Sequence, residues 1–156
     1  MNKLAFQAIE ALLRQKKALS TAESLTGGGI GSLLTGVPGS SQAYWGGVIS
    51  YTDSVKAAVL GVPVELLKRE GAVSAPVAEA MAQGVREKLK TDFSLSVTGL
   101  AGPGGDDYGH PVGTVFIGFC DENGCLSRHF LFQGDREAVR TQTAQAALHL
   151  LLSKIS

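Results

Sequence analysis

A serine hydroxyl, a tyrosine phenol and a lysine amine occur close together in the stretch GSSQAYWGGVISYTDSVK, residues 39–56. They belong to Ser41, Tyr51 and Lys56. A serine hydroxyl attacks an amide carbon only after a base has removed its proton, and a neutral lysine is a known base for serine. If the fold brings the three groups together, the stretch can carry out nucleophilic acyl chemistry. The alternative interpretation is a strand with its flanking turns.

Lys56 can act as a base only if its amine is neutral near pH 7, well below its ordinary pKa of about 10.4. The lysine lies near the start of an expected helix, whose positive dipole end disfavours an ammonium by only about 0.3–1 kcal/mol. One pKa unit corresponds to about 1.36 kcal/mol, so burial must supply most of the shift. The apolar stretches WGGVISY and AAVLGV offer such surroundings. A surface lysine is the alternative.

Two glycine-rich turns follow expected strands, TGGGIGSLL at residues 26–34 and TGLAGPGG at residues 98–105. The first resembles a dinucleotide-binding turn, but the third glycine of the pattern that starts at Gly27 falls on Ser32. No acidic residue ends a second strand ~20 residues later, as ribose binding would require. Two such turns still predict a cleft above the sheet, with backbone N–H groups that can bind an anion or a carbonyl oxygen.

Hydrophobic periodicity predicts helices and strands along the whole chain. Helices are expected at residues 3–17, 53–61, 63–71, 74–92 and 134–154, and the first glycine-rich turn opens another. Strands are expected at residues 18–24, 45–51, 93–99, 112–120 and 125–132, the last two as an antiparallel hairpin. We therefore predict a single α/β domain over residues 1–156, a three-layer α/β/α sandwich with a mixed central sheet.

The composition is typical of a globular chain, because 44% of the 156 residues are hydrophobic, 18% are charged and the formal net charge is zero. A nucleic-acid surface would need clustered positive charge, so we expect no nucleic-acid partner. No apolar run is long enough to span a membrane and the N-terminus lacks a signal-peptide pattern, so we expect a cytoplasmic protein without membrane contact.

Cys120 and Cys125 flank an expected hairpin turn. A disulfide between them is one interpretation, and two small buried thiols are the preferred one.

Seven motifs occur in order along the chain: TAESLTGG, GSSQAYWGGVISY, SVKAAVLGV, GAVSAPVAEAMA, VTGLAGPGG, PVGTVFIG and GDREAVR. In these motifs the chain resembles the CinA C-terminal domain family over residues 4–152. Stand-alone members of that family are PncC-type amidohydrolases, which convert nicotinamide mononucleotide to nicotinic acid mononucleotide and ammonia. The resemblance implies this activity, with a small-molecule nucleotide as substrate, no cofactor and no metal, and association into a homo-oligomer.

Carried over position by position, the resemblance implies Ser41 as the nucleophile, Lys56 as its base and Tyr51 as an assisting group. It also implies that Arg140 binds the nucleotide phosphate. The glycine-rich turns and the turn at residue 39 are expected to add backbone N–H groups. The expected substrate-binding residues are Ser24, Thr98, Arg140, Gly39, Gly27 and Gly99.

Several of these roles have alternatives. Instead of an enzyme, the chain can be a catalytically silent CinA-type module that binds a nucleotide or a partner, linked to competence or DNA damage. Ser24 and Thr98 suit helix or turn capping equally well. Arg136 and Arg140 share a face at the start of the last helix, where they predict either a bound anion or an ion pair with Glu137 or another subunit.

Three further sites carry open or weaker interpretations. His110 with Asp106 and Asp107 matches no metal spacing, and a mobile lid over residues 100–111 is preferred. Glu23 is either an acid that orients the site or a plain carboxylate at a strand end. The aromatic pair at residues 44 and 45 is expected in the core or the pocket wall.

Overall fold

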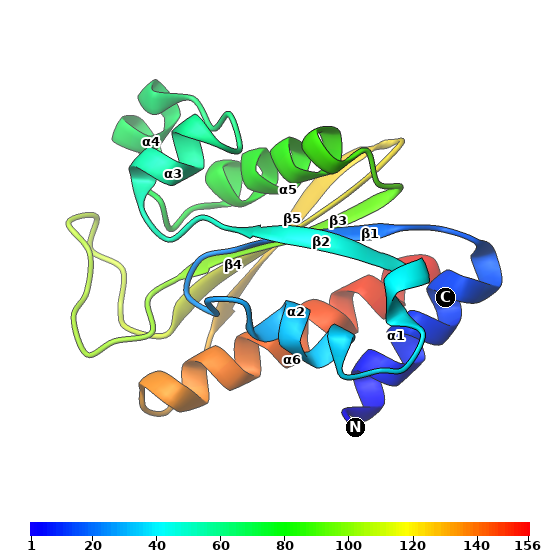
Figure 1. The fold of residues 1–156 in the computed structure, drawn as a ribbon. Coiled ribbons are helices and arrows are strands. Elements are labelled where there is room, and N and C mark those ends of the chain that lie inside the picture. The colour runs from blue at the N-terminus through cyan, green and yellow to red at the C-terminus, as the bar shows by residue number, and fades with distance from the viewer.

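The computed structural model describes residues 1–156, which form a five-stranded mixed sheet with helices on both faces (Figure 1). The strand order is β2-β1-β3-β4-β5. β1 (Leu19–Glu23) pairs in parallel with β2 (Tyr44–Ile49) and with β3 (Phe93–Gly99). β4 (Thr114–Asp121) and β5 (Gly124–Leu131) extend the sheet in antiparallel fashion. The expected α/β/α sandwich with a mixed central sheet is confirmed.

Two groups of three helices cover the sheet (Figure 1). One face carries α1 (Lys3–Gln15), α2 (Gly29–Thr35) and α6 (Arg136–Ile155). The other carries α3 (Asp53–Ala58), α4 (Val64–Glu70) and α5 (Ala75–Leu89). A short 3-10 turn, η1 (Ser40–Gln42), precedes β2. None of the helices has both the length and the apolar character that a membrane crossing requires.

The alternation of side chains along β3 explains the two layers. Leu95 and Val97 enter the larger core, which α1, α2 and α6 complete. Ser94 and Ser96 point the other way and donate hydrogen bonds to backbone carbonyls of α5. Because successive strand residues face opposite sides of a sheet, one strand holds both helical layers in place.

Glu23, the last residue of β1, fixes the start of α2. Its buried carboxylate accepts hydrogen bonds from Thr26 Oγ1 at 2.6 Å, from the Ile30 N–H at 2.9 Å and from the Gly31 N–H at 3.0 Å. The first N–H groups of a helix have no partner within the helix, and an acceptor with negative charge stabilises them. Glu23 is therefore a buried acid at the end of β1 that holds the loop at residues 24–28 between β1 and α2, and it orients the site through that loop.

Cys120 and Cys125 form a disulfide across the β4–β5 hairpin. The preferred expectation of two separate buried thiols was therefore wrong. The turn between the strands is so tight that Asp121 pairs directly with Gly124, which puts the two cysteines opposite each other with their Cα atoms 4.1 Å apart. The sequence indicates the turn but not this register.

The two edge strands carry exposed apolar side chains, Trp45 and Ile49 on β2 and Leu131 on β5. Tyr44 turns inward as expected, packs against the larger core and has its hydroxyl 2.6 Å from that of Thr21. Trp45 lies instead on the surface, 57% exposed, because it belongs to the free edge of the sheet. Unpaired edges suit subunit association, and the homo-oligomer stays a prediction.

Replacing Glu23 with alanine is expected to lower the free energy of unfolding by about 2–4 kcal/mol, because it leaves buried donors without an acceptor. Urea unfolding followed by circular dichroism measures this change. Glu122→Ala, in the exposed β4–β5 turn, is the control and should change the stability by less than about 0.5 kcal/mol. Equal effects of the two substitutions would contradict the capping role.

Candidate active site

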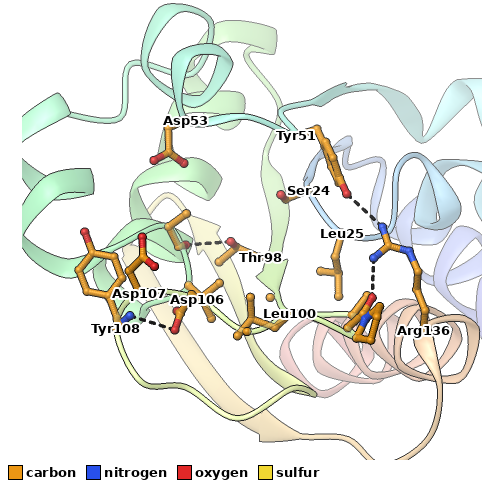
Figure 2. A pocket seen from close by; sticks show the side chains of 18 of the residues that line it. Ser24, Leu25, Tyr51, Asp53, Thr98, Leu100, Asp106, Asp107, Tyr108 and Arg136 are labelled. Carbon is orange, nitrogen blue, oxygen red and sulfur yellow. Dashed lines mark hydrogen bonds between the residues drawn. The ribbon is translucent and has the colours of Figure 1, made fainter.

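A cavity of about 620 Å³ opens beside the carboxyl ends of the parallel strands (Figure 2). This is the edge at which open α/β sheets bind ligands. Its walls come from the loops after β1 and β2, from α3, from the end of β3 with the loop that follows, and from the first turn of α6. The lining residues that bear on chemistry are Ser24, Tyr51, Asp53, Lys56, Thr98 and Arg136.

Three adjacent strands deliver the central side chains. Ser24 directly follows β1, Thr98 lies in the last part of β3, and Tyr51 comes two residues after the end of β2. β1 lies between the other two strands and is parallel to both, so their carboxyl ends meet at one place. The Ser24 N–H donates to the Val97 carbonyl at 3.1 Å, which continues the strand pairing into the site.

The amine of Lys56 is buried beside Ser24. Its side chain is 1% exposed, and Nζ lies 3.1 Å from Ser24 Oγ, 2.8 Å from the Ser50 carbonyl oxygen and 3.4 Å from the Tyr51 carbonyl oxygen. Carbonyl oxygens can only accept hydrogen bonds. A neutral amine therefore gives its two N–H groups to the two carbonyls and turns its lone pair to the Ser24 hydroxyl.

Burial lowers the pKa of the Lys56 amine below its ordinary value, and the Asp53 carboxylate opposes part of that shift. No carboxylate lies within salt-bridge distance of Nζ. Because desolvation disfavours the charged form, the neutral form gains. This is the direction that a general base requires.

Ser41 does not meet Lys56. It lies on η1, exposed, before β2 begins, whereas Lys56 follows the end of β2. Five steps along a strand at about 3.3 Å each separate the two ends by about 17 Å. Within the chain, β2 therefore holds the two members of the expected Ser41–Lys56 pair apart. Gly39, which precedes η1, lies at the same distant end.

The expected phosphate ligand Arg140 also lies outside the main cavity. Its guanidinium donates to the carbonyl oxygens of Leu25 and Thr26, at 2.9 and 3.3 Å, and supports the loop after β1 from the α6 side. Gly27 lies against this guanidinium and likewise does not line the cavity. Arg136, one helical turn earlier, lines the cavity in its place.

Arg136 and Tyr51 form one side of the cavity. The Arg136 guanidinium donates to the Tyr51 hydroxyl at 3.0 Å and to the Gly102 carbonyl at 2.8 Å (Figure 2). A guanidinium has five N–H groups, so donors remain for a ligand anion. The Tyr51 hydroxyl is thus bound to Arg136, whereas the lysine amine contacts the backbone carbonyl of Tyr51.

Thr98 and Gly99 line the floor of the cavity. The Thr98 hydroxyl donates to the Ala72 carbonyl at 2.8 Å, so it ties β3 to the segment before α5. A Cβ atom at Gly99 would come within 2.7 Å of the Thr114 carbonyl oxygen, so close pairing with β4 requires glycine there. Thr98 and Gly99 therefore fix the position of the backbone that forms this part of the cavity.

The loop at residues 100–111 forms the remaining wall and is attached at both ends. The Tyr108 hydroxyl donates to the Lys68 carbonyl at 2.9 Å, and the Gly102 carbonyl accepts from α6. His110 Nδ1 lies 2.7 Å from Asp106 Oδ2. Burial raises the pKa of Asp106, but hydrogen bonds from His110 and from the Tyr108 N–H outweigh it, and the pKa lies below its ordinary value. Asp106 is therefore ionised and serves the loop itself.

Comparison with known proteins agrees with this architecture. The family model for the CinA C-terminal domain matches residues 1–155. A CinA-like protein of Synechocystis is 47% identical over 151 residues, which cover 94% of this chain and 36% of that protein. A CinA superfamily protein from Klebsiella pneumoniae has a TM-score of 0.96 at 31% identity, covering 99% of this chain and 98% of the other. The competence/damage inducible protein CihA from Agrobacterium tumefaciens gives 0.93 at 37% identity, with 97% and 93% covered.

The fold is an α/β/α sandwich with a cavity at the carboxyl ends of its parallel strands. The chain belongs to the CinA C-terminal domain family. It spans about a third of the length of the curated relatives that it matches, and nearly the whole length of the solved structures.

The pKa of Lys56 is expected to fall further when Asp53 is replaced with asparagine, because that change removes the charge that favours the ammonium. A pH titration of the Lys56 side-chain carbon resonances, assigned by their loss in Lys56→Met, measures the pKa directly. Asp121→Asn, on the distant β4–β5 hairpin, should leave it unchanged. A rise in the pKa after Asp53→Asn would show that the electrostatics of the site differ from those described.

Proposed function

We propose that this domain is an amidohydrolase that removes the carboxamide nitrogen of nicotinamide mononucleotide as ammonia and leaves nicotinic acid mononucleotide. The observation that carries the proposal is the contact of 3.1 Å between the buried Lys56 amine and the Ser24 hydroxyl, at the edge of a cavity large enough for a nucleotide. The nucleophile is Ser24 rather than Ser41, because only Ser24 contacts a base.

The reaction follows from the donors and acceptors around the amine. Lys56 Nζ takes the proton of Ser24 Oγ as the oxygen attacks the carboxamide carbon. The resulting ammonium returns this proton to the nitrogen that leaves as ammonia, and an ester remains on Ser24. A water molecule then attacks the ester, with Lys56 again removing the proton, and releases the carboxylic acid and the serine.

The negative oxygen of the tetrahedral intermediate needs fixed donors. The Leu25 N–H is our candidate, because Leu25 directly follows the nucleophile and lines the cavity, and its N–H makes no hydrogen bond to the protein. The Thr98 hydroxyl is less suited because it donates to the Ala72 carbonyl. Donors from the turn at residues 39–41 lie at the far end of β2.

The phosphate of the nucleotide is assigned to Arg136. A guanidinium binds phosphate oxygens in pairs and stays charged, and Arg136 is the arginine that lines the cavity. Binding energy from this remote group can orient the carboxamide over Ser24. Arg140 is assigned a positioning role, since its hydrogen bonds hold the two carbonyls that follow Ser24.

Ser24→Ala and Lys56→Ala are each expected to reduce ammonia release from nicotinamide mononucleotide by about 1,000-fold or more, and the double variant should be little worse. Ser41→Ala should retain activity near that of the unmodified protein. The assay contains excess chelator, and turnover abolished by the chelator would contradict the metal-free mechanism. Binding of the nucleotide without any turnover by the unmodified protein would favour the catalytically silent module.

Arg136→Ala is expected to lower kcat/KM for nicotinamide mononucleotide by about 10- to 100-fold, the loss that removal of a charged hydrogen bond of about 1.5–3 kcal/mol produces. Hydrolysis of nicotinamide riboside, which lacks the phosphate, should be almost unchanged. Arg140→Ala should instead slow both substrates equally, because it releases the loop that carries Ser24. A selective loss for the phosphorylated substrate in Arg140→Ala, and not in Arg136→Ala, would reverse the two assignments.

A further inference from the structure

The charges that line the cavity are divided between two sides. Arg136 lies on one side, and Asp53, Asp106 and Asp107 lie on the other (Figure 2). Asp106 is engaged by His110 and by two backbone N–H groups. The carboxylates of Asp53 and Asp107 make no hydrogen bond or ion pair with the protein. Two uncompensated negative charges therefore face the space that the substrate would occupy.

An aromatic ring lies on the same side of the cavity. The Tyr108 ring packs on Gly71, where a Cβ atom would come within 2.7 Å of it, and the hydroxyl is anchored on the Lys68 carbonyl. The ring is nevertheless 48% exposed. An immobilised aromatic ring beside carboxylates attracts a flat organic cation through both its face and the neighbouring charges.

The position of Asp53 has a cost for the proposed chemistry. Its carboxylate favours the charged form of Lys56 and so works against the base. Asp53 lies in the first turn of α3, where an acidic side chain suits the helix dipole, but a serine and a neutral lysine give its charge no role inside the cavity. A positively charged substrate would be attracted by the Asp53 carboxylate. The positive charge of the substrate would also offset the effect of Asp53 on the pKa of Lys56.

We infer that Asp53, Asp107 and Tyr108 form a cation-selective wall that recognises the positively charged pyridinium ring of the substrate. The inference rests on the proposed function and adds to it the part of the site that distinguishes a cationic ring from a neutral one. The substrate class is a zwitterion, whose ring charge faces the wall and whose phosphate faces Arg136. A neutral ring with the same amide, ribose and phosphate binds more weakly.

Calorimetric titration of the Ser24→Ala variant tests the wall without turnover. The two probes are nicotinamide mononucleotide and its 1,4-dihydro form, which has a neutral ring and is otherwise alike. The oxidised form should bind more tightly, and adding Asp107→Asn should weaken it by about 2- to 5-fold, as expected for a partly exposed charge pair. The affinity for the dihydro form should stay the same. Glu122→Gln makes the same change in net charge far from the cavity and should alter neither affinity.

Equal affinities of the Ser24→Ala protein for the two probes would overturn the inference. So would Asp107→Asn and Asp53→Asn substitutions that weaken the binding of the oxidised and the dihydro probe equally. The proposed function is judged separately, by ammonia release from the unmodified protein. A preference for the cationic ring without any ammonia release would defeat the proposed function and support the wall. Ammonia release without that preference would defeat the wall alone, and failure of both nucleotides to bind would defeat both.

Discussion

The burial of one lysine amine is the constraint on which the site depends. A charged ammonium is costly to place in a protein interior without a carboxylate partner, and Lys56 has none within ion-pair distance. Its surroundings offer two carbonyl oxygens and the Ser24 hydroxyl. The same burial that disfavours the charge leaves a lone pair that can take the Ser24 proton. The location of the side chain and its proposed role as a base therefore have one physical origin.

The rest of the fold holds the serine in front of that amine. The loop after β1 is fixed at three points: Ser24 pairs with β3, Glu23 caps α2, and Arg140 binds the Leu25 and Thr26 carbonyls from α6. One of these contacts comes from the sheet, and the other two come from the helical layer that contains α2 and α6. A nucleophile on a loop needs this kind of support, since loops are otherwise the most mobile parts of a domain.

Much of the fold is predictable from periodicity, because the longer elements have clear apolar patterns and glycine or proline residues lie close to the ends of several of them. The need to bury Lys56 also follows from the sequence alone. Ser41 lies before the strand at residues 44–49 and the lysine lies after it, so the structure separates the two residues that the sequence motif places together. Ser24 directly follows a buried strand that is parallel to β2, so it lies at the same edge of the sheet as Lys56. The choice of Arg136 over Arg140 depends on how α6 crosses the sheet, and no local pattern encodes that crossing.

The most direct test of the Ser24–Lys56 pair is a crystal structure of the Ser24→Ala variant with nicotinamide mononucleotide bound. We expect the carboxamide carbon within about 4 Å of the Cβ atom at position 24, the distance of an attack geometry with the hydroxyl removed. The Lys56 amine should lie within hydrogen-bond reach of the carboxamide nitrogen or of a water molecule beside it. A carboxamide bound next to Ser41, or one turned away from the Lys56 amine, would contradict the central claim.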